Sequence, residues 1–202
     1  MALINLDPAL EKAREDLSCG NPEQMAARAK VAYDSGAACF HVPFLGALYR
    51  VSFPEGRVSC PGGEVSPPIQ VLLLHYLTGA SGIAPEGRLI SYKELPGGDI
   101  YIVPFTHRAI NPLVRIFGGS PQKLILAAEK LGGKKAAPGD VSVTVPFFPL
   151  VPLTFVLWEG DDEFPPSGNV LFDCTASTHL ATEDYAYLAG IGVFELKKAA
   201  GV

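Results

Sequence analysis

Apolar residues recur along this chain with two periods, one typical of helices and one typical of strands. The longest uncharged cluster of β-branched and aromatic residues, 153–158 (LTFVLW), predicts a strand buried on both faces. Prolines at 146, 149 and 152 precede it, so we expect an edge or an extended lead-in there. Residues 159–169 are acidic and rich in Gly and Pro, which predicts a turn before a second strand over 170–172.

Helical spacing is clear in the N-terminal half. Residues 9–17 place Leu10, Ala13 and Leu17 on one face of a short helix. Asn21 and Pro22 are typical of a helix start, and the apolar spacing carries this helix to a C-terminal Gly36. Residues 66–79 form an almost entirely apolar segment, which predicts a central helix covered on most sides. Strands are predicted over 39–42, 48–53 and 57–60, the last two joined by a hairpin.

In the C-terminal half the patterns alternate. Strands are predicted over 89–92, 100–103 and 140–145, and helices over 105–117, 120–131 and from Thr182 onward. We expect Pro112 to restart the first of these helices with Asn111 as its cap, and Thr182 to be the N-cap of the last one. Glu183 and Asp184 then lie in a first turn, where the helix dipole favours acids.

The mixture of helices and hairpins lacks a regular strand–helix–strand rhythm. It predicts an α+β fold with a mixed, mainly antiparallel sheet and several short helices. We expect one globular domain over residues 1–202, with 1–20 as a possible helical arm and 191–202 as a frayed tail.

Composition excludes several classes of protein. The chain is 48% hydrophobic and 18% charged, which excludes disorder, and its net charge of −5 argues against nucleic acid as a partner. Prolines interrupt the longest apolar run, so no membrane span is expected. The N-terminus has no signal pattern, and the four cysteines are scattered without a C-x-x-C pair. We therefore expect a cytoplasmic protein with reduced, mostly buried thiols.

The acidic turn over 159–163 is the densest group of carboxylates. It can be solvated, paired with Arg or Lys, or bound to a hard cation such as Mg²⁺ or Ca²⁺, although its spacing differs from the calcium loop. Arg108 and Arg115 would share one face of a continuous helix, as an anion-binding pair or as partners of the turn, and charge complementarity favours the second. We predict that Trp158 and Phe164 bury their rings and that Arg108, Arg115 or a backbone donor holds at least one of Asp161, Asp162 and Glu163.

Several segments together resemble a known family. They are VPLTFVLWEGDDEFPPSGNVLFD and LATEDYAYL, with LLLHYLTGASG, ISYKELPGGDIY and FTHRAINPLVRIFGG upstream. They are similar to domain-of-unknown-function family 3786, which occurs in anaerobic bacteria and archaea, and the resemblance covers nearly the whole chain. Some members are joined to a cysteine-rich iron–sulfur domain, so the resemblance implies an iron–sulfur protein as a possible partner.

Three hypotheses of function follow, and none names a cofactor or settles whether the protein is an enzyme. The first is a small-molecule or cofactor-binding accessory domain of anaerobic metabolism, because an apolar, aromatic shell surrounds polar groups at 158–163 and 173. The second is a metal-dependent enzyme that uses the acidic turn and Asp173 as ligands. The third is an interaction domain that docks an iron–sulfur protein. The candidate ligand-binding residues are Trp158, Asp161, Asp162, Glu163, Asp173, Arg108, Arg115 and His75, the last a core histidine or a ligand.

Overall fold

The computed structural model describes residues 6–202, which fall into two compact units. Unit 1 holds the described residues up to Ala84 together with 148–150 and 178–180. Unit 2 holds 85–147, 151–177 and 181–202. Helices and antiparallel sheets occur together, so the α+β prediction is confirmed. The single domain expected over 1–202 stays a prediction.

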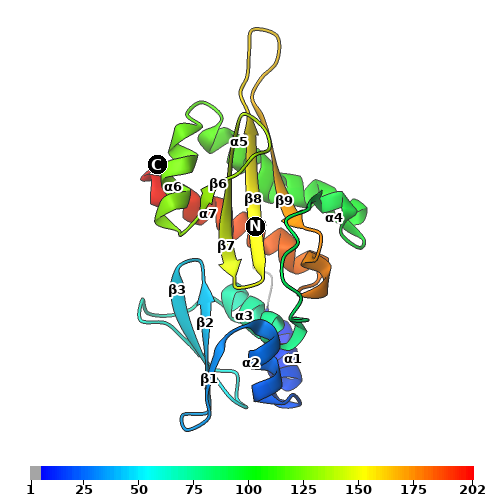
Figure 1. The fold of residues 1–202 in the computed structure, drawn as a ribbon, viewed down its shortest axis with the longest axis vertical. Helices are drawn as coiled ribbons and strands as arrows, with labels where there is room; N and C mark the ends of the chain where they lie inside the picture. The colour runs from blue at the N-terminus through cyan, green and yellow to red at the C-terminus, as the bar shows by residue number, and fades with distance from the viewer. Residues whose placement is uncertain (1–5) are drawn as a thin grey trace. The chain divides into compact units, whose positions relative to one another are not determined.

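Unit 1 combines helices with a four-stranded antiparallel sheet in the order β1-β2-β3-β4 (Figure 1). Its elements are α1 (Asp7–Ser18), α2 (Pro22–Ala29), β1 (Ala32–Asp34), β2 (Cys39–Phe44), β3 (Ala47–Ser52), β4 (Val58–Ser59) and α3 (Pro67–Gly79). The hairpin predicted around residues 54–56 is confirmed, since β3 and β4 pair on either side of it. The central helix predicted over 66–79 is confirmed as α3.

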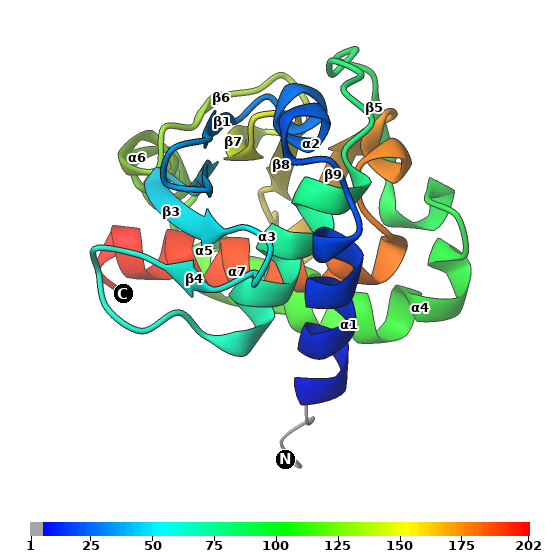
Figure 2. The same cartoon turned by 90° about the horizontal axis from the view of Figure 1, so that it is seen from below.

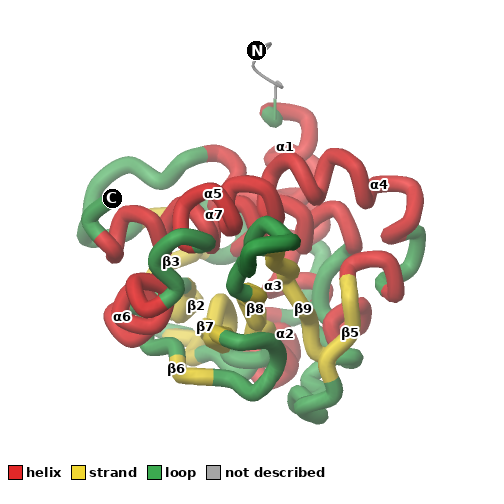
Figure 3. Tube along the Cα trace, turned by 90° about the horizontal axis from the view of Figure 1, so that it is seen from above, coloured by secondary structure: helices red, strands yellow, loops and turns green. Residues whose placement is uncertain are grey.

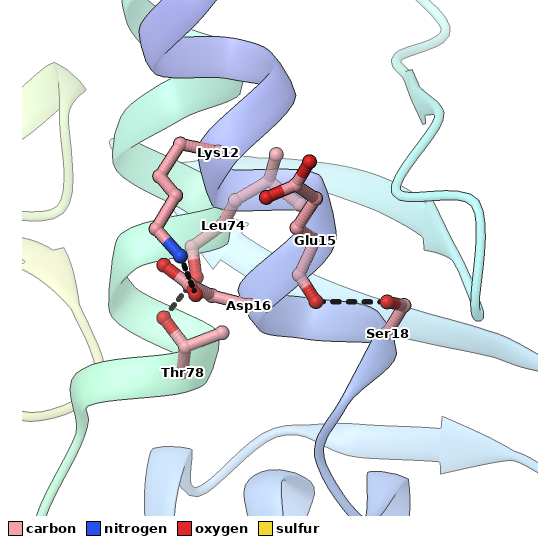
Figure 4. Close-up of polar contacts among 6 residues, drawn as sticks. All are labelled: Lys12, Glu15, Asp16, Ser18, Leu74 and Thr78. Atoms are coloured by element: carbon pink, nitrogen blue, oxygen red, sulfur yellow. Dashed lines mark hydrogen bonds and ion pairs between the residues drawn. The ribbon is translucent and has the colours of Figure 1, made fainter.

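The first helix packs against α3 rather than forming a free arm (Figure 2). Leu10, Ala13 and Leu17 are buried, as their spacing predicts, because this face meets α3. Figure 4 shows the polar contacts that accompany the two helices, including a Lys12–Asp16 ion pair of 2.8 Å. The start of the expected arm, residues 1–5, lies outside the described residues.

The second helix is shorter than predicted. Asn21 is its N-cap, as expected, and its side chain accepts a hydrogen bond from the Gln24 amide at 3.0 Å. The helix ends at Ala29, because Lys30 takes a left-handed conformation with φ of 55°, and residues 32–34 form β1. The expected continuation to Gly36 is therefore wrong. Helical spacing alone could not distinguish it from a strand that follows at once.

Tyr76 organises the interior of unit 1. Its hydroxyl donates to the Ala29 carbonyl at 2.8 Å and accepts from the Leu150 amide at 3.2 Å. Its ring stacks on Phe148, with centroids 4.2 Å apart, and Phe148 also contacts Phe44. Tyr76 thus connects α2 to Phe148 and Leu150, and Phe148 extends the contact to β2.

Unit 2 is built on a five-stranded antiparallel sheet in the order β5-β9-β8-β7-β6. Its elements are β5 (Leu89–Ser91), α4 (Gly98–Phe105), α5 (Asn111–Phe117), α6 (Gln122–Lys130), β6 (Lys134–Lys135), β7 (Val141–Phe148), β8 (Val151–Trp158), β9 (Ser167–Asp173) and α7 (Thr182–Ala200). Phe148, the last residue of β7, belongs to unit 1. Within residues 6–202, no helix is long and apolar enough to cross a bilayer.

The strand predicted to be buried on both faces is confirmed as β8, where Leu153 to Leu157 are all buried. Pro146 lies inside β7 and Pro152 inside β8, so the expected lead-in is wrong, but the alternative of an edge holds at Pro146. The ladder between β6 and β7 involves only Val143 and Thr144 of β7. It ends before Pro146, whose missing N–H therefore breaks no bond with β6.

Helices α5 and α7 cover one face of this sheet (Figures 1 and 3). Gly192 permits the close approach of α7, because a Cβ atom there would lie 2.5 Å from the Phe147 ring and 2.6 Å from the Phe155 ring. The helix continues to Ala200 and buries Val193 and Leu196, so the C-terminal segment is helical rather than frayed.

The start of α7 differs by one residue from the prediction. Ala181 is the N-cap, and Thr182 is the first helical residue. The Thr182 hydroxyl donates to the Pro96 carbonyl at 2.7 Å instead of capping its own helix. Glu183 and Asp184 lie in the first turn, as predicted.

Candidate functional site

The acidic turn, residues 159–163, lies in the loop 159–166, which joins β8 to β9 and projects beyond the sheet of unit 2 (Figure 1). Asp161 Oδ1 accepts from the amides of Phe164, at 2.7 Å, and Glu163, at 2.9 Å. These hydrogen bonds hold the pKa of Asp161 below its ordinary value. The prediction that a backbone donor holds one of the three carboxylates is confirmed.

The rings beside this turn are not buried. Trp158 is 40% exposed and Phe164 is 67% exposed, so that prediction is wrong. The Asp161 amide donates to the Phe164 carbonyl, which closes the turn on itself instead of folding it back over the core. Within the described residues, neither Arg108 nor Arg115 forms an ion pair with the turn, so the expected charge pairing is also wrong.

The segment 98–117 is one helical run rather than a strand followed by a separate helix. Residues 100–103, expected as a strand, lie in α4, and Asn111 has helical angles instead of capping α5. Gly98 makes this start possible, because a Cβ atom there would clash with the Tyr92 carbonyl. Local preference for a strand in the Ile-, Tyr- and Val-rich α4 is overridden by this packing.

A π-helical turn, Thr106–Ile110, joins α4 to α5. The Asn111 amide donates to the Thr106 carbonyl, five residues back. Pro112 follows at once, and in a regular helix its ring would clash with the carbonyl four residues earlier, that of Arg108. The wider turn relieves this clash, and such turns frequently accompany functional sites.

A cavity of about 290 Å³ lies between α4, the π turn and the first turns of α7, entirely within unit 2. Four aromatic rings, two small apolar residues and two charged residues line it: Tyr92, Tyr101, Phe105, Tyr187, Pro104, Ala186, Arg108 and Glu183. The floor is buried, since Tyr92, Phe105 and Ala186 are at most 6% exposed. The rim, with Tyr101, Arg108 and Glu183, is exposed.

The aromatic walls are held in a defined geometry. Tyr92 and Phe105 stack with centroids 4.0 Å apart and planes 7° apart. The Tyr92 hydroxyl donates to the Thr182 carbonyl at 3.2 Å, which anchors the ring to the start of α7. The Arg108 guanidinium lies over the Tyr187 ring, 5.1 Å from its centroid, a cation–π contact.

The electrostatics of the cavity centre on Tyr92 and on two opposite charges. Burial, assisted by the charge of Glu183, raises the pKa of Tyr92 to about 12 although Arg108 opposes the shift, so its hydroxyl stays a neutral donor at physiological pH. Among the described residues, Arg108 and Glu183 form no ion pair with each other or with any other side chain. Both charges are therefore open to a ligand.

Arg115 does not join Arg108 in this cavity. It lines a second, more open hollow of about 360 Å³ at the base of the acidic turn, whose other lining residues are Ile110, Asn111, Val114, Pro166, Ser167 and Gly168. The two arginines are seven residues apart, which in a regular helix places them on one face. They line different hollows, on the two sides of the π turn.

Asp173 is buried and accepts hydrogen bonds from three backbone amides and one hydroxyl. Its carboxylate accepts from the amides of Glu86 and Gly87 and from the amide and hydroxyl of Thr175, at 2.7–3.1 Å. Burial favours the protonated acid, but these hydrogen bonds outweigh it and hold the pKa of Asp173 below its ordinary value. His75 lies on α3 in unit 1, so it does not line the cavity.

The cysteines and metal-binding residue types are dispersed. All four cysteines are free, and Cys39 is buried while Cys19 is exposed and the other two are half-buried, so the expectation of mostly buried thiols is wrong. Over residues 6–202, no three His, Cys, Asp or Glu side chains are grouped so that they could hold a metal ion.

Sequence reasoning found Arg108 but missed the aromatic lining of the cavity. A signal was present: Tyr101, Phe105 and Arg108 recur at helical spacing, as do Glu183 and Tyr187. It was hidden because residues 100–103 resemble a strand. Because α4 is helical, Tyr101, Phe105 and Arg108 form one stripe, which faces the stripe of Glu183 and Tyr187 on α7 across the cavity.

Comparison with known proteins places the chain in a family. No curated protein and no solved structure matches it. A family model described as Domain of unknown function (DUF3786) matches residues 21–195, a span that includes every residue lining the cavity. The chain therefore belongs to this domain-of-unknown-function family, as its sequence segments predict.

Proposed function

We propose that this protein is a ligand-binding accessory domain that takes a small aromatic molecule into the cavity of unit 2. The observation that carries the proposal is the set of four aromatic rings around one space, with buried floor and exposed charged rim. Pockets of this kind, mostly apolar with a few placed polar groups, are typical of small-molecule sites. The volume of about 290 Å³ suits a ligand of one or two rings.

The setting we propose is the cytoplasm of an anaerobe. The four free cysteines, one of them exposed, suit a reducing compartment, where thiols stay unpaired. An ultraviolet–visible spectrum of protein purified without oxygen tests whether the ligand is a coloured cofactor. An absorbance band above the protein band identifies a cofactor, and a flat spectrum favours a colourless ligand.

The first prediction tests the cavity as a binding site. We expect aromatic fragments to bind the purified protein in ligand-observed NMR, and we expect Tyr101→Ala to weaken them about tenfold, because it removes one ring from the rim. Ile100→Ala is the matched control: Ile100 precedes Tyr101 on α4, is 76% exposed and does not line the cavity. A screen without hits, or equal losses in both variants, would contradict the proposal.

A further inference from the structure

The two charged residues of the cavity have opposite signs and stay apart. Arg108 comes from the π turn and Glu183 from the first turn of α7, and they do not pair with each other. Side chains of opposite charge that share one space ordinarily attract each other, and a bidentate Arg–carboxylate pair would be the strong form of that contact. Here the guanidinium is held over Tyr187 instead.

Tyr187 lies on the same face of α7 as Glu183. The two residues are four apart, so their backbone positions are about 6 Å apart along the helix axis, and Arg108 lies over the Tyr187 ring. Both charges are at the exposed rim, and the buried rings of Tyr92 and Phe105 form the floor below them. The cavity thus offers a cation and an anion at the rim of an aromatic slot.

We propose that the ligand is an amphoteric aromatic molecule, with an acidic group that binds Arg108 and a nitrogen donor group that binds Glu183. The planar guanidinium donates two parallel hydrogen bonds to a carboxylate while its face stays on Tyr187. The Glu183 carboxylate is acceptor-only and takes an ammonium or amidine N–H. The aromatic body between these groups fills the slot. This inference rests on the proposed function, since it names the class of ligand for the same cavity.

A matched set of four probes tests the inference by NMR titration of the full chain. They are para-(aminomethyl)benzoate, which carries both charges, para-toluate and para-methylbenzylamine, which carry one each, and para-methylbenzyl alcohol, which carries none. We expect the doubly charged probe to bind about tenfold more tightly than either singly charged probe, since a charge-assisted hydrogen bond at a partly exposed site contributes about one decade.

Two variants assign the charges to their residues. In Arg108→Gln we expect the carboxylate to add no affinity over the uncharged probe, while the amine still adds affinity. In Glu183→Gln we expect the reverse: the amine adds no affinity and the carboxylate still does. Arg115→Gln and Asp99→Asn are the controls: they remove a charge from the same helical run but not from the cavity lining, and all preferences should persist.

The outcomes separate the two proposals. If the uncharged probe binds the cavity as tightly as the doubly charged one, the inference is wrong while the aromatic site stands. If neither these probes nor any aromatic fragment shifts the cavity resonances, both fail together.

Discussion

At the scale of single residues, Asp173 illustrates how one buried carboxylate fixes a loop. Four donors from residues 86, 87 and 175 converge on it. A carboxylate is suited to this role because both oxygens accept and neither donates. The sequence marks Asp173 as a polar residue at the end of a strand, but only the fold shows that two of its donors are the backbone amides of Glu86 and Gly87, at least 86 residues away.

Asp173→Asn should destabilise the protein by about 3 kcal/mol, because the amide turns one acceptor into a donor that faces N–H groups. The folded-state pKa of Asp173 lies below its unfolded value of 3.8. Its contribution is therefore present above pH 3.8 and is lost as pH falls through the folded pKa. Urea unfolding at neutral and acidic pH measures both effects.

The control for this prediction is Asp161→Asn. Asp161 has a pKa lowered by backbone donors too, but it is fully exposed in the acidic turn. We expect little change in the free energy of unfolding from this substitution. Equal losses for the two variants would show that burial of Asp173 adds nothing.

At the scale of elements, the sequence predicts those whose ends carry strong signals. The Ser66-Pro67-Pro68 start identifies α3, and the uncharged run 153–158 identifies β8. Prediction from the sequence fails for α4, because its Ile, Tyr and Val residues prefer strands and its Pro104 argues against a helix. The site depends on α4, so its aromatic lining could not be predicted until that element was known to be helical.

Gly190 and Gly192 of α7 are two residues apart, and replacing each by alanine tests how closely the helix packs on the sheet. Gly192→Ala should destabilise the protein by about 2 kcal/mol, because its Cβ meets the rings of Phe147 and Phe155 inside a packed core. Gly190→Ala should be neutral or stabilising by up to about 1 kcal/mol, because its nearest neighbour lies at 3.6 Å and alanine favours helix. Thermal and urea unfolding compare the pair, and a loss at Gly190 equal to that at Gly192 would contradict the argument.

At the scale of the whole molecule, each unit has a tyrosine that must stay protonated. Burial raises the pKa of Tyr76 in unit 1 and, to about 12, that of Tyr92 in unit 2, from an ordinary value of 10.0. Both hydroxyls donate to backbone carbonyls, of Ala29 and Thr182. The α+β class could be predicted from the sequence, whereas the pairing of each tyrosine with a distant carbonyl could not, because it depends on tertiary packing.

We expect both units to lose stability at alkaline pH. A raised folded-state pKa means that the stabilisation is fully present below pH 10.0 and is lost as pH rises through the folded value. Denaturant unfolding from neutral pH to about pH 12 tests this, with the single tryptophan, Trp158, as a fluorescent reporter of unit 2. Tyr92→Phe should flatten the alkaline loss seen by Trp158; an unchanged pH profile would contradict the assignment.

The π turn changes the direction in which side chains point along the helical run 98–117, so α4 and α5 face different neighbours. Each residue of an α-helix advances by about 100° around the axis, so a widened turn rotates everything downstream relative to everything upstream. Residues before it, including Tyr101 and Phe105, are directed to α7, and residues after it, including Val114 and Arg115, to the base of the β8–β9 hairpin. Removing a single residue from 106–110 would therefore rotate the residues of α5 by about 100° relative to those of α4. The segment would stay helical, but one of the two hollows would lose its lining residues from this helix.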